Sequence, residues 1–216
     1  MPKLVPSLAL FAALVPASTR ASAQQPRNPF AHAPEIVNEP SAPAPQHVHL
    51  LTSGISFDLP AGWNLARHDG ELSTFALDAR SSLPGTQLRS VAQLAFNPFP
   101  SSTFTGALFY TSVMPHATPL QCSNQATAPP SHPVTTVQIG GQSFKHGYNE
   151  HGEVCTEERD EVYTALRKDT CYRFDLVINT FCGGDVSGSR DLTPQQLEAV
   201  RLRLENVLRT VNFDPR

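Results

Sequence analysis

Residues 153–181 read EVCTEERDEVYTALRKDTCYRFDLVINTF, which is the pattern of two long strands joined by a tight turn. In the second segment, large apolar residues recur at every second position: Tyr172, Phe174, Leu176 and Ile178. A period of two is typical of a strand with one face in a core. Lys168 and Asp169 are predicted to be the central residues of the turn. The stretch therefore predicts a long antiparallel β-hairpin.

The position of the turn decides which residues of the hairpin face each other. With Lys168 and Asp169 at its centre, Tyr163 lies opposite Phe174, and Cys155 lies opposite Cys182. Directly opposed residues have Cβ atoms roughly 4.5–5.5 Å apart, which a disulfide can bridge after a small adjustment. The register therefore favours one cysteine pair, although a single β-bulge would remove the argument.

The cysteine count indicates the chemical environment of the chain. There are four cysteines, Cys122, Cys155, Cys171 and Cys182, and an even number is typical of two disulfides in an oxidising compartment. Three connectivities are possible, and pairing Cys155 with Cys182 leaves Cys122 for Cys171 by elimination. The alternative is a four-cysteine zinc site, but the intervals contain no C-x-x-C pair.

The first 23 residues have the pattern of a secretory signal peptide. Lys3 precedes an apolar run at residues 4–16, and Ala21-Ser22-Ala23 before Gln24 resembles a cleavage site. No later segment approaches the roughly 20 apolar residues that a membrane-spanning helix needs, and no cysteine follows the cleavage site to take a lipid. We expect a secreted or periplasmic protein without membrane insertion.

Residues 24–48 are predicted to be a disordered tether, and residues 49–216 a single globular domain. The tether contains six prolines: Pro26, Pro29, Pro34, Pro40, Pro43 and Pro45. Proline at this density favours extended conformations that bury little apolar surface. The whole chain has a formal net charge of −3 and no basic stripe, so we expect no nucleic-acid partner.

The domain is predicted to be α+β, an antiparallel sheet flanked by helices. Further strands are expected at 55–59, 72–77, 91–96 and 107–114, with a hairpin turning at Gly140-Gly141 and a surface connection at 122–133. Thr193 is expected to cap a C-terminal helix with Pro194 and Gln196 in its first turn. The helix has an apolar face: Leu197, Val200, Leu204, Val207, Leu208 and Val211.

Three segments resemble the Mog1/PsbP-like superfamily, in particular its exported bacterial members. They are GISFDLPAGW at 54–63, VQIGG at 137–141 and LRTVNF at 208–213, with Thr210 where the family often has Ser. The resemblance spans 50–215 and implies an α/β/α sandwich. Because these motifs close a core, they imply no active site. The resemblance favours a non-catalytic binding or accessory protein of the cell envelope, with an unidentified protein or envelope component as partner.

Other residues leave a second function class open. His146 and His151, with Glu150 and Glu153, could meet at a hairpin edge in a secreted hydrolase or metal-dependent enzyme. His47-Val48-His49 could form a weak zinc or copper site. An acidic group also lies nearby: Glu150, Glu153, Glu157, Glu158, Asp160 and Glu161. Since no nucleophile elbow, zinc-protease motif or calcium loop occurs, the sequence predicts no catalytic, cofactor-binding or metal-binding residues.

Overall fold

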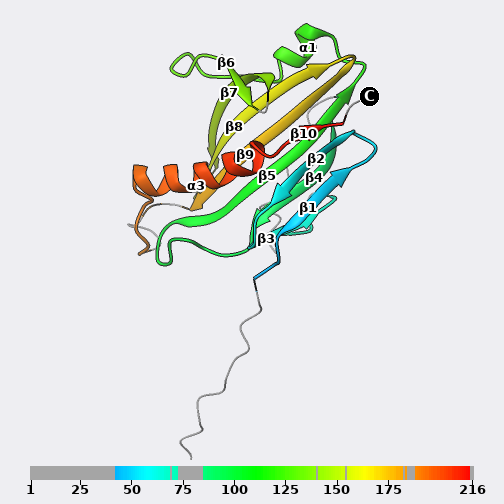
Figure 1. The fold of residues 1–216 in the computed structure, drawn as a ribbon. Helices are drawn as coiled ribbons and strands as arrows, with labels where there is room; N and C mark the ends of the chain where they lie inside the picture. The colour runs from blue at the N-terminus through cyan, green and yellow to red at the C-terminus, as the bar shows by residue number, and fades with distance from the viewer. Residues whose placement is uncertain are drawn as a thin grey trace, which may run out of the picture. The chain divides into compact units, whose positions relative to one another are not determined.

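The computed structural model describes residues 42–68, 70–72, 85–139, 141–153, 155–181, 183 and 188–214. Two sheets form most of this region (Figure 1). The large sheet has the strand order β3 (Trp63–Ala66), β4 (Gln87–Leu94), β5 (Phe104–Pro115), β9 (Thr170–Phe181), β8 (Thr156–Arg167), β7 (Gln142–Glu153) and β6 (Thr135–Ile139). Its neighbouring strands are antiparallel throughout the described residues.

The small sheet joins the start of the domain to its end. Strand β2 (Ile55–Leu59) lies between β1 (Gln46–Leu50) and β10 (Asn212–Phe213). Strand β1 begins inside the segment predicted to be a tether, because Val48 and Leu50 face the core and are each 3% exposed. The expected strand at 55–59 is confirmed as β2.

The β8–β9 hairpin has the register predicted from the sequence. Tyr163 pairs with Phe174, and Arg167 pairs with Thr170 across the turn. Lys168 has a positive φ of 55°, which closes the turn without interrupting the ladder. Because no bulge interrupts this pair of strands, the facing positions remain aligned from Arg167 to Thr156.

One face of the large sheet carries the main core. Helix α3 (Pro194–Leu208) packs on β9 and β5, as Figure 1 shows, and the small sheet covers the remainder. Thr193 and Gln196 form the expected capping box at the start of α3. Of the predicted apolar face, Val200, Leu204, Val207 and Leu208 are fully buried, whereas Leu197 is only partly buried. Val211 is buried beyond the end of the helix.

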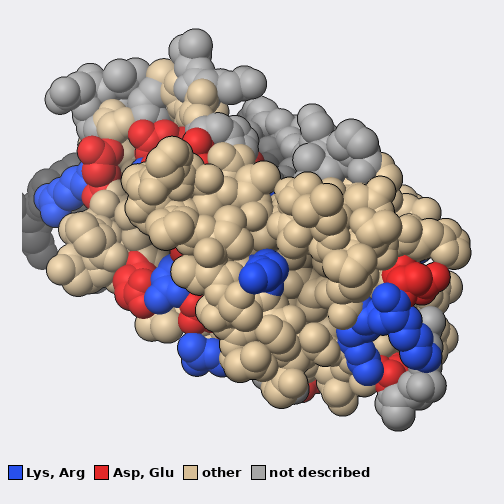
Figure 2. All heavy atoms as spheres, turned by 90° about the horizontal axis from the view of Figure 1, so that it is seen from above, with Lys and Arg blue, Asp and Glu red and all other residues tan. Residues whose placement is uncertain are grey.

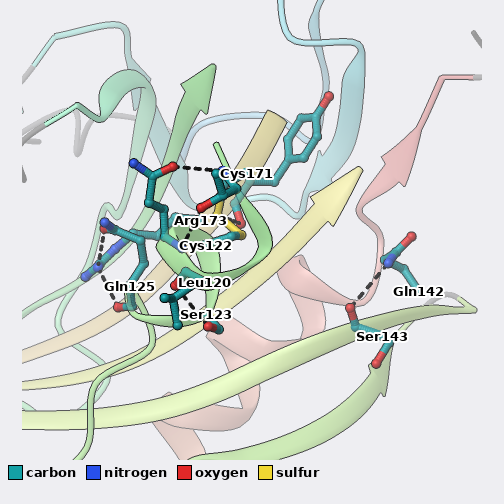
Figure 3. The surroundings of a disulfide bond; sticks show 11 residues. Leu120, Cys122, Ser123, Gln125, Gln142, Ser143, Cys171 and Arg173 are labelled. Carbon is teal, nitrogen blue, oxygen red and sulfur yellow. Dashed lines mark hydrogen bonds between the residues drawn. A yellow bond between two sulfur atoms is a disulfide. The ribbon is translucent and has the colours of Figure 1, made fainter. Parts of the chain in front are cut away.

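On the opposite face of the large sheet, a disulfide attaches a short helix to the central strand β9. Helix α1 (Pro119–Ser123) carries Cys122, which bonds to Cys171 on β9 with a Cα–Cα distance of 5.3 Å (Figure 3). Cys171 alternates with the core residue Tyr172, so α1 lies on the face opposite α3. The pairing predicted by elimination is confirmed. Cys155 is also disulfide-bonded, but Cys182 lies outside the described residues, so their pairing remains a prediction.

Several other elements differ in their bounds from the prediction. The strand expected at 91–96 is β4, which begins at Gln87, and the central strand expected at 107–114 is β5, which extends to Phe104 and Pro115. Most of the strand expected at 72–77 lies outside the described residues. Helix α1 was not expected, because its five residues are too few for an apolar period.

The fold class is confirmed as α+β with antiparallel sheets. The flanking by helices is modest, since α1 has 5 residues and α3 has 15. Among the described residues, neither helix is long and apolar enough to cross a lipid bilayer.

Candidate functional site

A hollow of about 500 Å³ lies beside residues 148–150 of β7. Its lining comes from one loop and one strand: Thr127, Ala128, Pro129, Ser131, His132, Tyr148, Asn149 and Glu150. The loop precedes β6, and the strand residues follow the point where β6 stops pairing with β7. The hollow therefore lies between a loop and an edge of the large sheet.

Prolines explain why the sheet is interrupted here. Strand β6 pairs with β7 only from Ile139 opposite Gln142 to Thr135 opposite His146. Pro129, Pro130 and Pro133 precede β6 and have no N–H to donate to a continuing ladder. The chain leaves the edge of β7 at this point, and the hollow forms between the two.

Gly147 positions the near end of the loop. A Cβ atom at this glycine would lie 2.2 Å from the backbone oxygen of Thr127, closer than any side chain can be accommodated without movement. The loop backbone therefore passes directly over β7 at a residue without a side chain. This contact fixes the loop next to the aromatic and acidic residues that follow on β7.

A polar network extends from the hollow to β8. The Tyr148 hydroxyl donates to Glu150 Oε2 at 3.0 Å. Arg159 Nε lies 3.3 Å from Glu150 Oε1, and its Nη2 lies 2.7 Å from Glu157 Oε2. Partial burial, followed by the hydrogen bond to Glu150, raises the pKa of Tyr148 to about 12. Tyr148 therefore stays neutral at physiological pH and acts as a hydrogen-bond donor.

An aromatic pair borders the same hollow. The rings of His132 and Tyr148 have centroids 4.9 Å apart and are tilted by 40°. Ser131 Oγ lies 3.1 Å from Nδ1 of His132. The hollow thus combines aromatic faces with a carboxylate, groups that can contact the stem and the head of a basic side chain.

A second polar group lies further along the same face of β7 and β8. His146 Nε2 is hydrogen-bonded to Glu161 Oε2, and its ring stacks on Tyr163 with the centroids 4.4 Å apart. Burial, followed by the charge of Glu161, raises the pKa of Tyr163. Across from them on α3, hydrogen bonding to Glu198 raises the pKa of Arg201, which also pairs with Glu205.

The histidines proposed for catalysis do not share a site. His146 and His151 are five residues apart on β7, which corresponds to about 17 Å along a strand. His47 and His49 lie on the exposed side of β1 and bind different carboxylates, Asp58 and Asp214. Within the described ranges, no group of three or more histidine, cysteine, aspartate or glutamate residues could hold a metal ion.

The acidic residues of the sequence are divided between two faces. Glu150, Glu157 and Glu161 lie on the face that carries α3, together with Arg159. Asp160 is on the other face, where it is 1% exposed and lies 3.8 Å from Nη2 of the buried Arg173. The strand alternation separates residues that look like one cluster in the sequence.

Arg173 anchors the loop that leads to the hollow. Its Nε donates to Asp175 Oδ1 at 2.7 Å, and its Nη1 donates to the backbone oxygen of Gln125 at 2.9 Å (Figure 3). Arg173 and Asp175 are two positions apart on β9, so the period of the strand places them on the same face, although the sequence analysis assigned them no partner. The contact of Arg173 with Gln125 depends on the path of the loop and has no sequence signal.

The face viewed in Figure 2 is largely uncharged in its middle, and acidic and basic side chains lie side by side at its ends. This face therefore has no extended basic surface of the kind that binds nucleic acid.

Comparisons with known proteins find likeness only between structures. No family model and no curated protein matches the sequence. The cyanobacterial PsbP (CyanoP) of Synechocystis sp. PCC 6803 is 12% identical, with a TM-score of 0.44, over 79% of this chain and 92% of that one. The Ran-binding protein Mog1p of Saccharomyces cerevisiae is 12% identical, with a TM-score of 0.42, over 78% and 95%.

Two further structures are similar at the same level. LpqN of Mycobacterium tuberculosis, described as involved in cell envelope biogenesis, is 9% identical, with a TM-score of 0.40, over 79% of this chain and 91% of that one. The chain spans 46% of the length of a Bacteroides thetaiotaomicron protein that is 11% identical, with a TM-score of 0.40. The neighbours include Mog1/PsbP-like proteins, as the sequence resemblance predicted, and the likeness concerns the fold alone.

Proposed function

We propose that the chain is exported and acts as a non-catalytic binding or accessory domain of the cell envelope. The hollow between residues 127–132 and β7 is its binding site. The observation that carries the proposal is the combination of aromatic faces and a carboxylate at an interrupted sheet edge, formed by His132, Tyr148 and Glu150. Binding pockets commonly combine apolar walls with a few placed polar groups.

The charged groups of this site are arranged for binding. Glu150 accepts from Tyr148 and pairs with Arg159, so both of its oxygens already have partners. A general base needs a pKa near the working pH and access to a proton on the substrate. A carboxylate held between a phenol and a guanidinium is better suited to orienting a bound group.

The disulfide between Cys122 and Cys171 supports export. Disulfides persist in the periplasm and outside the cell and are rare in the cytoplasm. This bond connects α1 to β9. Gln125, whose backbone oxygen accepts from Arg173, lies between α1 and the loop that lines the hollow. Oxidation therefore helps to hold the proposed binding site.

To test the proposal, the full chain is expressed in a bacterium, and the cytoplasmic and exported fractions are compared for the protein. We expect a mature form that begins at Gln24 in the exported fraction, with Cys122 linked to Cys171 in peptide maps made without reduction. A photo-crosslinking residue at position 148 should give a specific envelope adduct that the same residue at position 202, on the exposed side of α3, does not give. A chain that keeps its leader and has four free thiols would exclude the proposal.

A further inference from the structure

The charge of the hollow decides which class of ligand it can take. Among the described residues that line it, Glu150 brings the only carboxylate, and none brings an ammonium or a guanidinium group. The neighbouring Arg159 is engaged elsewhere, because its Nη2 lies 2.7 Å from Glu157 Oε2. Its Nη1 donates to Thr180 Oγ1 at 3.3 Å. The lining therefore offers a complementary charge to a cationic ligand and repels an anionic one.

Glu150 keeps acceptor capacity for a further donor. A carboxylate has about four lone-pair sites, and the Tyr148 hydroxyl takes one of them on Oε2 at 3.0 Å. Arg159 Nε lies 3.3 Å from Oε1, which is longer than the roughly 2.7–2.9 Å of a close charge-assisted hydrogen bond. The Glu150 side chain is 48% exposed, so a ligand in the hollow can reach its remaining lone pairs.

The aromatic wall of the hollow is held in place by the backbone of the loop. The His132 N–H donates to the backbone oxygen of Pro129 at 2.9 Å, which closes a turn over residues 129–132. Pro129 and Pro130 restrict φ to about −65° in this turn. Since the His132 ring already packs on Tyr148, the wall loses little conformational entropy when a ligand binds.

The positions of the ring and the carboxylate favour one kind of cation. Because the Tyr148 hydroxyl bonds to Glu150, the carboxylate lies at the hydroxyl end of the ring. A cation that lies flat on the ring and has donors at its far end can contact both groups. A guanidinium is planar, weakly hydrated and forked, and it stacks on aromatic faces. An ammonium is a compact and strongly hydrated point charge, so it fits this half-open site less well.

On the basis of the function proposed above, we infer that the hollow binds an arginine side chain from an exposed segment of the envelope partner. The aliphatic stem of the arginine lies against the aromatic wall, and its guanidinium stacks on Tyr148 and donates to Glu150. The volume of about 500 Å³ leaves room for backbone atoms on either side of the arginine. The contact requires no pairing between the partner's main chain and β7.

The first test titrates small probes into the mature, oxidised protein at low salt and follows them by NMR. The capped peptide GRG is compared with GKG, with the same peptide carrying citrulline in place of arginine, and with the neutral sugar diacetylchitobiose. We expect GRG to bind, with an affinity that falls as salt is added, and the citrulline peptide to bind at least about fivefold more weakly. GKG should bind more weakly than GRG, and the sugar should not bind.

Three outcomes of this titration would overturn the inference. Equal binding of the arginine and citrulline peptides would show that the positive charge is not recognised. Tighter binding of GKG than of GRG would exclude a site for a planar cation. Binding of the sugar without binding of GRG would identify the hollow as a site for glycans.

Substitutions then locate the binding site. Glu150→Gln should weaken GRG binding at least about fivefold, because it removes the complementary charge. The matched control is Glu198→Gln on α3, whose carboxylate is 49% exposed and also pairs with an arginine, Arg201. Both variants lose one negative charge, so equal effects would mean that only the net charge attracts the peptide and would overturn the inference.

The ring contact is tested separately. Tyr148→Leu keeps an apolar side chain and removes the aromatic face, so GRG binding should weaken about two- to fivefold. Circular dichroism checks that this variant is folded, and His132→Ala removes the second ring of the wall if it is not. Unchanged binding in a folded variant of each kind would overturn the stacked arrangement.

The two proposals fail in different experiments. If GRG does not bind but the adduct at position 148 persists, the arginine inference fails and the envelope function stands. If the chain stays in the cytoplasm with reduced thiols, the proposed function fails whatever the peptides do.

Discussion

Strand β7 has two halves with different surroundings: an inner half, residues 142–146, which pairs with β6, and an outer half, residues 147–153, which does not. In the inner half, Phe144 is 1% exposed and packs edge-on against Phe174 at 5.9 Å, with paired strands on both sides. In the outer half, Tyr148 and Glu150 face a hollow, and the pairing between β6 and β7 has ended. Residues 142–146 are therefore held in the main core, whereas residues 148–150 border the hollow that we propose as the binding site.

The largest expected effect on the free energy of unfolding comes from a substitution in the core beneath α3. Leu204 is 0% exposed on α3, whereas Leu202 is 40% exposed on the same helix. Leu204→Ala should lower the free energy of unfolding by about 2–5 kcal/mol, because it removes buried contacts and leaves a cavity. Leu202→Ala should change it by less than about 0.5 kcal/mol. Urea unfolding followed by circular dichroism measures both, and similar losses would contradict the assignment of the core.

Removal of the disulfide is expected to have the next largest effect on the free energy of unfolding. Cys122 and Cys171 are 49 residues apart in the sequence, so their bond restricts a long loop in the unfolded chain. Replacing both with Ser should lower the free energy of unfolding by about 2–4 kcal/mol. The adduct formed at position 148 should weaken as well if the disulfide positions the loop. A stability loss with an unchanged adduct would show that the disulfide is not needed to position the loop.

Gly147 lies at the boundary between the two halves of β7. Gly147→Ala should cost about 1–3 kcal/mol, because the new Cβ atom would meet the backbone oxygen of Thr127. Gly106→Ala on β5 is the matched control, since its nearest neighbour would be the Gln93 side chain at 3.6 Å. Thermal unfolding compares the two variants. Equal stability would mean that the loop moves aside freely.

The smallest expected effect is a pH dependence at the hollow. The pKa of Tyr148 is raised to about 12 from an unfolded value of about 10, so the folded state favours the neutral phenol. Its contribution to stability is complete below pH 10 and is lost as the pH rises towards 12. The phenolate absorbance of the wild type minus that of Tyr148→Phe should titrate near pH 12. A difference titration near pH 10 would contradict the burial of this hydroxyl.

The sequence predicted those parts of the fold that depend on local period and on turn position. The alternation of Tyr172 and Phe174 and the turn at Lys168-Asp169 were sufficient to place Tyr163 opposite Phe174. The capping box at Thr193 placed the start of α3. The candidate site could not be predicted in the same way, because His132 and Tyr148 meet across a loop, and no sequence period describes the path of a loop.

By itself, the sequence determined the α+β class and the hairpin register, because neighbouring residues on a strand or helix obey fixed periods. It proposed the pairing of Cys122 with Cys171 only by elimination, and the structure shows that bond. The tertiary structure alone decided that the chain crosses β7 at Gly147 and that the prolines before β6 leave a hollow. These features depend on contacts between residues far apart in the chain, whose distances are set by packing.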